Sequence, residues 1–129
     1  MLSIENIFQY IVRIEKYLEH TVNPNCVNCS KTQEEKEDQL VKTLIEYKNY
    51  YDKNELYFPT ETANKINLMN EKFSEVWDDW KEKKKIEQTS YDIALQIQNW
   101  RNILDKVKDD IPTIKNEIKT EFRELIGVE

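Results

Sequence analysis

Apolar residues in the second half of the chain recur in alternating steps of four and three residues. The stripe consists of Ile93, Ile97, Trp100, Leu104, Val107, Ile111, Ile114 and Ile118. Such spacing keeps one apolar face of a helix turned toward a partner helix, as in coiled coils. The pattern therefore predicts one long helix over about residues 90–126. Because the stripe keeps its phase across Pro112, we favour a kinked helix, although Asp109 or Asp110 could also cap a new one.

The rest of the chain shows three more stripes with helical spacing. A helix over about residues 4–20 would bury Ile4, Ile7, Ile11, Ile14 and Leu18. A helix over about 31–51 begins with the capping pairs Ser30–Gln33 and Thr32–Glu35 and would bury Leu40, Leu44, Tyr47 and Tyr51. A helix over about 60–87 begins after Pro59 and would bury Ile66, Met69, Phe73, Val76 and Trp80.

These four segments predict an all-α fold in a single domain over residues 1–129. The expected architecture is an antiparallel bundle of about four helices, built from two helical hairpins with coiled-coil-like packing. The last helix is longer than the first two, so part of its stripe needs another cover. We expect the overhang beyond Pro112, where Ile114, Ile118 and Phe122 would pack against a second chain. A homodimer is one form that this contact could take.

Composition limits the classes of function. The chain has 129 residues, 34% of them charged, with a net charge of −6, one glycine and one histidine. The charge is evenly spread, which disfavours nucleic-acid binding, and no P-loop, GxGxxG, HExxH or GxSxG motif occurs. No apolar run approaches the roughly 20 residues of a membrane helix. We therefore expect a cytoplasmic, non-enzymatic protein with no membrane partner and no obligate cofactor.

The segment between the first two helices carries a CxxC motif, Cys26-Val-Asn-Cys29. Two thiolates at this spacing can chelate zinc, with His20 as a candidate third ligand. Free thiols, or a disulfide or redox pair, fit the same residues. A CxxC between two helices resembles the zinc hook of the coiled-coil ATPases that repair DNA double-strand breaks, over residues 20–40 alone. That resemblance implies a site shared by two chains; Pro24 precedes both cysteines here, whereas the hook usually has proline between them.

Two surface features complete the candidate sites. Tyr50, Tyr57 and Phe58 lie around the connection between the second and third helices and are candidates for an exposed protein-binding patch. The lysine-rich segment Lys81–Lys85 could touch phosphate, although cations also suit a helix C-terminus. The sequence thus favours a helical protein–protein interaction or oligomerisation module. The alternatives are a zinc- or thiol-dependent assembly protein and, third, a weak nucleic-acid binder.

Overall fold

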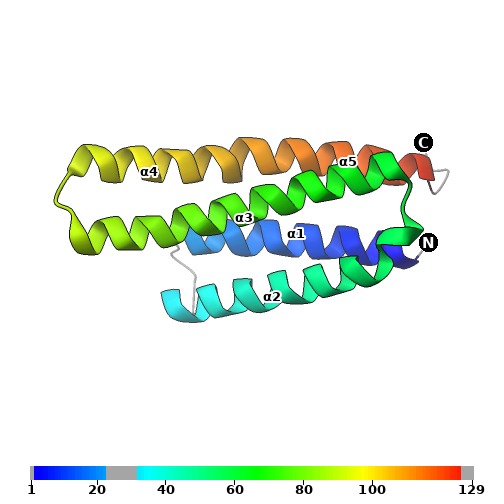
Figure 1. Cartoon of the computed structure of the whole chain (residues 1–129), viewed down its shortest axis with the longest axis horizontal. Helices are drawn as coiled ribbons and strands as arrows, with labels where there is room; N and C mark the ends of the chain where they lie inside the picture. The colour runs from blue at the N-terminus through cyan, green and yellow to red at the C-terminus, as the bar shows by residue number, and fades with distance from the viewer. Residues whose placement is uncertain (1, 23–31, 126–129) are drawn as a thin grey trace.

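The chain is an all-α bundle in a computed structural model that describes residues 2–22 and 32–125 (Figure 1). Its helices are α1 (Leu2–Val22), α2 (Gln33–Asn54), α3 (Thr60–Thr89), α4 (Ile93–Asp105) and α5 (Ile111–Leu125). A short 3₁₀ turn, Glu55–Tyr57, joins α2 to α3, and a π-helical turn, Lys106–Asp110, joins α4 to α5. No strand occurs in the two described ranges. The predicted fold class is confirmed.

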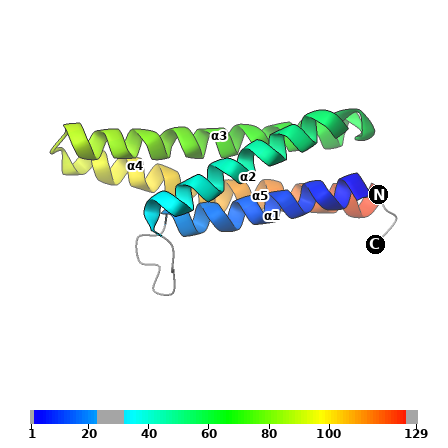
Figure 2. The same cartoon turned by 90° about the horizontal axis from the view of Figure 1, so that it is seen from below.

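α1, α2, α3 and the continuous rod formed by α4 and α5 run alternately up and down (Figures 1 and 2). α1 packs along α2, α3 packs along both α4 and α5, and α5 returns beside α1. The beginning of α1 and the end of α5 therefore lie at the same end of the bundle (Figure 1). No helix in the described residues is long and apolar enough to cross a membrane.

The core follows the predicted stripes closely in the body of the bundle. Every predicted stripe residue of α1 and α3 is buried: Ile4, Ile7, Ile11, Ile14, Leu18, Ile66, Met69, Phe73, Val76 and Trp80. On α2 Leu40, Tyr47 and Tyr51 are buried, whereas Leu44 is half-buried. Thr32 caps α2 by accepting a hydrogen bond from the Glu35 amide at 3.2 Å. Ser30, the other predicted cap, lies outside the described residues.

α4, the π turn and α5 form one continuous rod around Pro112, as the continuous phase of the stripe predicted (Figure 1). The buried stripe from Ile103 to Phe122 advances nineteen residues in five steps, and five turns of regular α-helix hold about eighteen. The π turn accommodates the extra residue and keeps the stripe on one face. It also falls just before Pro112, whose nitrogen cannot donate to the preceding turn.

Aromatic side chains close the end of the bundle that carries the α2–α3 connection. The Phe58 ring stacks on those of Tyr51 and Phe122, with centroids 6.2 Å away in each pair. Phe8 of α1 meets Phe122 edge-on at 6.0 Å. Phe58, a predicted surface residue, is therefore buried in the core. The chain turns back sharply after the 3₁₀ turn and carries this ring inward.

The prediction that Ile114, Ile118 and Phe122 need a second chain for cover rested on a wrong premise. Their side chains are 6%, 0% and 5% exposed within the single chain. The α2–α3 connection and the start of α1 lie at the same end as α5, so all four rods cover one another there (Figure 1). The unequal helix lengths leave an overhang at the opposite end instead.

Two buried tyrosines hold their protons unusually strongly. Burial, together with the nearby Glu55 and Asp52 carboxylates, raises the pKa of the Tyr51 hydroxyl to about 12. Burial also raises the pKa of Tyr47 above its usual range, with a smaller contribution from Tyr51. The Tyr51 hydroxyl donates to the Ala63 carbonyl oxygen at 3.3 Å, which ties α2 to α3. Both groups are thus built into the core as neutral phenols.

Candidate functional site

The α3–α4 hairpin projects beyond the ends of α1 and α2 (Figures 1 and 2). We call residues 85–97 the overhang; at its base, Lys84 and Glu87 of α3 line a pocket together with Gln33 at the start of α2. Asp92 caps α4 by accepting a hydrogen bond from the Leu95 amide at 3.1 Å. The Gln96 side chain donates to the Ser90 carbonyl oxygen at 3.1 Å. The overhang is therefore a well-formed helical hairpin with two open sides.

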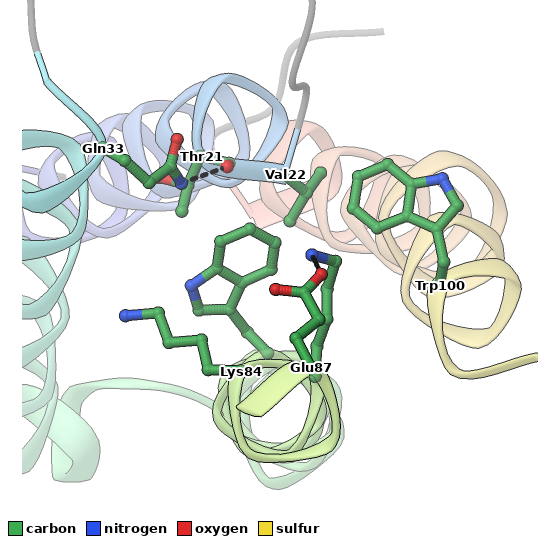
Figure 3. A pocket seen from close by; sticks show the side chains of 8 residues that line it. Thr21, Val22, Gln33, Lys84, Glu87 and Trp100 are labelled. Atoms are coloured by element: carbon green, nitrogen blue, oxygen red, sulfur yellow. Dashed lines mark hydrogen bonds and ion pairs between the residues drawn. The ribbon is translucent and has the colours of Figure 1, made fainter. Parts of the chain in front are cut away.

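The overhang carries four large, exposed apolar side chains close together in sequence. Tyr91 is 100% exposed, Ile93 69%, Leu95 41% and Ile97 46%. Ile93 and Ile97 begin the stripe that continues through Trp100, and residues three and four apart share a helix face. In the body of the bundle this face turns inward, but α1 ends at Val22, beside Trp100 (Figure 3). The stripe thus runs out of the core onto the surface.

A pocket of about 380 Å³ lies where the overhang leaves the body (Figure 3). The Trp80 and Trp100 rings form part of its walls, with centroids 6.5 Å apart, and Val22 points into it from α1. The Lys83 ammonium lies 5.0 Å and 5.2 Å from the two ring centres and pairs with Glu87. The pocket is therefore an amphipathic cleft with two aromatic walls, and the Lys83 ammonium is held over both rings.

Buried polar contacts fix the base of this pocket. The Trp80 indole Nε1 donates to Glu37 Oε1 at 2.8 Å, and the same carboxylate pairs with Lys84. Glu37 is only 8% exposed, so its carboxylate is satisfied by partners on α3 rather than by water. Glu37 was not among the residues that the sequence singled out. Its position one turn before Leu40, on the buried face of α2, is the signal that could have revealed this role.

Charge is unevenly distributed along the hairpin. Residues 81–85 contain four lysines and one glutamate, whereas residues 86–100 contain Glu87 and Asp92 and no lysine or arginine. Three of the lysines form ion pairs: Lys81 with Asp78, Lys83 with Glu87 and Lys84 with Glu37. These pairs occupy much of the cluster that the sequence offered as a phosphate contact. Residues 81–85 are therefore basic, whereas residues 86–100 are weakly acidic and largely apolar.

The sequence predicted an uncovered stripe beyond Pro112, at the other end of the bundle, although it also contained a signal for the overhang. Beyond Trp80 the α3 stripe turns polar at Lys83, Glu87 and Ser90, and Ile86 is the one apolar side chain of this stretch that stays buried. Opposite them, α4 offers Ile93 and Ile97. A stripe that turns polar on one helix and stays apolar on its neighbour marks the end of the shared core. That change locates the overhang at the α3–α4 tip.

The other predicted site residues are not brought together. His20 is exposed near the end of α1, and Cys26 and Cys29 lie outside the described residues, so the zinc site stays a prediction. Tyr50 is half-buried, packs against Tyr10 with ring centroids 5.7 Å apart and accepts a hydrogen bond from Asn6 at 3.0 Å. Tyr57 is 75% exposed at the end of the bundle opposite the overhang. Its neighbour Leu56 is 98% exposed, so this end presents an exposed apolar pair, against four such side chains on the overhang.

α3 carries a row of carboxylates at helical spacing, Glu71, Glu75, Asp78 and Glu82, and all four residues are exposed. Among the described residues no group of three or more His, Cys, Asp and Glu side chains converges as a metal site would. Comparison of the chain with protein-family models, curated proteins and solved structures gives no match. Function therefore has to be inferred from the geometry of the chain itself.

Proposed function

We propose that this chain is a non-enzymatic helical interaction module that binds a protein partner through the overhang. The observation that supports this is the stripe of α4, which is buried from Ile103 onward and exposed at Ile97 and Ile93. Exposed apolar side chains that continue a core stripe are the usual mark of a surface completed by another protein. The body of the bundle serves as a rigid support for that surface.

Three features make the overhang better suited to this role than the rest of the described surface. It carries four exposed large apolar side chains, whereas Leu56 and Tyr57 form a pair at the other end, and Ile45 on α2 and Leu68 on α3 are exposed singly. It adjoins a pocket with two indole walls, the type of cleft that accepts an anchor side chain. It is also held rigid by Asp92 and by the Glu37–Trp80 hydrogen bond, which lowers the entropy cost of binding.

Site-specific photo-crosslinking in cells that express the full chain tests this proposal. A benzoylphenylalanine at position 97 should give a discrete adduct on irradiation, whereas the same residue at position 45 should give none. Ile45 is the matched control because it is a similarly exposed isoleucine in mid-helix, 56% against 46% exposed. The Ile93→Ser change should weaken the adduct formed from position 97. Equal yields at the two positions would refute the overhang as a binding surface.

A further inference from the structure

We infer that the partner of the overhang is a second copy of this chain, packed against it around a two-fold axis. This inference rests on the proposed function and makes it specific. In such a pair each overhang lies antiparallel to the other and covers the other's exposed stripe. A two-fold contact requires a surface that is complementary to itself. The overhang meets that requirement in its register, its shape and its charge.

The register follows from the stripe of α4. In an antiparallel pair of α4 helices centred close to Leu95, Ile93 of each copy lies opposite Ile97 of the other. Trp100 lies just beyond each end of this overlap, where α1 ends. All three residues share one helix face by their three- and four-residue spacing. The exposed stripe therefore covers its own copy without a register shift.

The shape is set by the length of the overhang. Its α3 side extends five residues from Lys84 to Thr89, which is about 8 Å at the rise of an α-helix. When two overhangs overlap fully, the tip of each reaches the base of the other. The tip presents the fully exposed Tyr91, and the base holds the pocket between Trp80 and Trp100. The two-fold arrangement thus brings one exposed aromatic ring to each aromatic-walled pocket.

The charges agree with the same arrangement. Lys81, Lys83 and Lys84 pair with carboxylates of their own chain, and Glu87 is the partner of Lys83. The charges that take part in the contact are therefore Asp92 at the tip of one copy and Lys85 of the other. An antiparallel pair brings these two opposite charges toward each other, whereas a parallel pair puts tip against tip and lysine against lysine. The charge contribution therefore favours the antiparallel arrangement.

The contact is small, because the overhang is only a few helical turns long. Interfaces at the low end of the size range form weak, reversible complexes. We therefore expect a monomer–dimer equilibrium in the micromolar range rather than an obligate dimer. The mass in solution should rise from 15.6 kDa toward twice that value as the protein concentration increases.

Sedimentation equilibrium of the purified full chain tests the inference. Ile97→Ser and Tyr91→Ser should each weaken self-association about tenfold or more, because the two-fold axis repeats each change at both halves of the contact. Ile45→Ser should leave the association constant unchanged. All three positions are exposed, and circular dichroism should show the same helical content in every variant. Irradiation of mixed ¹⁴N- and ¹⁵N-labelled protein carrying benzoylphenylalanine at position 97 should give crosslinked peptides from α4 that contain one copy of each isotope.

The outcomes separate this inference from the proposed function. A chain that stays monomeric at high concentration but gives an adduct with another protein at position 97 overturns the two-fold pair and supports the interaction module. A dimer that resists Ile97→Ser but dissociates with a chelator or after Cys26→Ser assigns self-association to the CxxC segment, which also overturns it. A monomer that gives no adduct at position 97 refutes both proposals.

Discussion

Ile118→Ala should lower the free energy of unfolding, because Ile118 is buried within a single chain. The Ile118 side chain is 0% exposed on α5, and Ile118→Ala removes three carbon atoms from the core. At about 0.8 kcal/mol for each buried CH₂ group, the lost transfer free energy is about 2.4 kcal/mol. The cavity that remains adds to this cost, and the better helix propensity of alanine offsets less than about 0.5 kcal/mol. We expect the free energy of unfolding to fall by about 3 kcal/mol.

Urea denaturation followed by circular dichroism measures this change. With a denaturant slope of about 2 kcal/mol per molar urea, the midpoint should fall by roughly 1.5 M. Ile45→Ala is the matched control, since Ile45 is 56% exposed on α2, and its effect should stay within about 0.5 kcal/mol. Both substitutions place alanine in the middle of a helix, so the difference between them reports burial.

Two results would refute this reasoning. If Ile118→Ala and Ile45→Ala shifted the midpoint equally, Ile118 would not be a core residue in solution. If the loss of stability grew with protein concentration, Ile118 would be covered by a second chain rather than by α1 and α3. The sedimentation behaviour of Ile118→Ala should match that of the unchanged protein while it is folded.

Three further changes probe separate contacts. Glu37→Ala should lower the free energy of unfolding by about 2 kcal/mol because it leaves the buried Trp80 indole N–H without an acceptor, and Glu37→Gln should cost less in the same urea titration. Thr32→Ala should cost about 1 kcal/mol through loss of the α2 cap, whereas Thr60→Ala, at an exposed position where α3 has no side-chain cap, should be nearly neutral. The free energy of unfolding should also fall above pH 10, because the pKa of Tyr51 is raised to about 12 in the folded chain. The stabilisation from this shift is complete below the unfolded pKa of 10.0 and is lost as the pH rises through 12. Tyr51→Phe should reduce this decline in urea titrations between pH 9 and 12.

The sequence predicted the body of the bundle well because helical periodicity identifies the face that a helix buries. All five stripe residues of α1 are buried, and the phase across Pro112 correctly indicated one rod. Periodicity is a local property, and these contacts depend on the spacing within single helices. The π turn itself was not predicted. Two successive steps of four occur both from Ile103 to Ile111 and from Ile114 to Phe122, so the step lengths alone did not locate it.

The sequence did not locate the overhang, because a stripe shows which face is apolar and not what covers it. Coverage depends on how the ends of four helices line up in space. That alignment was set by the tight α2–α3 connection, which places the start of α3 beside the end of α5. The stripe was also traced through Leu104, which is half-buried, whereas its neighbour Ile103 is 0% exposed. Both errors concern packing between helices, which a single helical pattern does not contain.

The position of the two described chain ends gives the proposed dimer a mechanical role. The start of α1 and the end of α5 lie together at the end of the bundle opposite the overhang (Figure 1). α3 spans 30 residues, or about 45 Å. Two copies joined by overhangs of about 8 Å would form a strut of roughly 80 Å with both pairs of ends outermost. Whatever is attached to either end of this chain would be held at a fixed, long separation, so the pair would act as a molecular spacer.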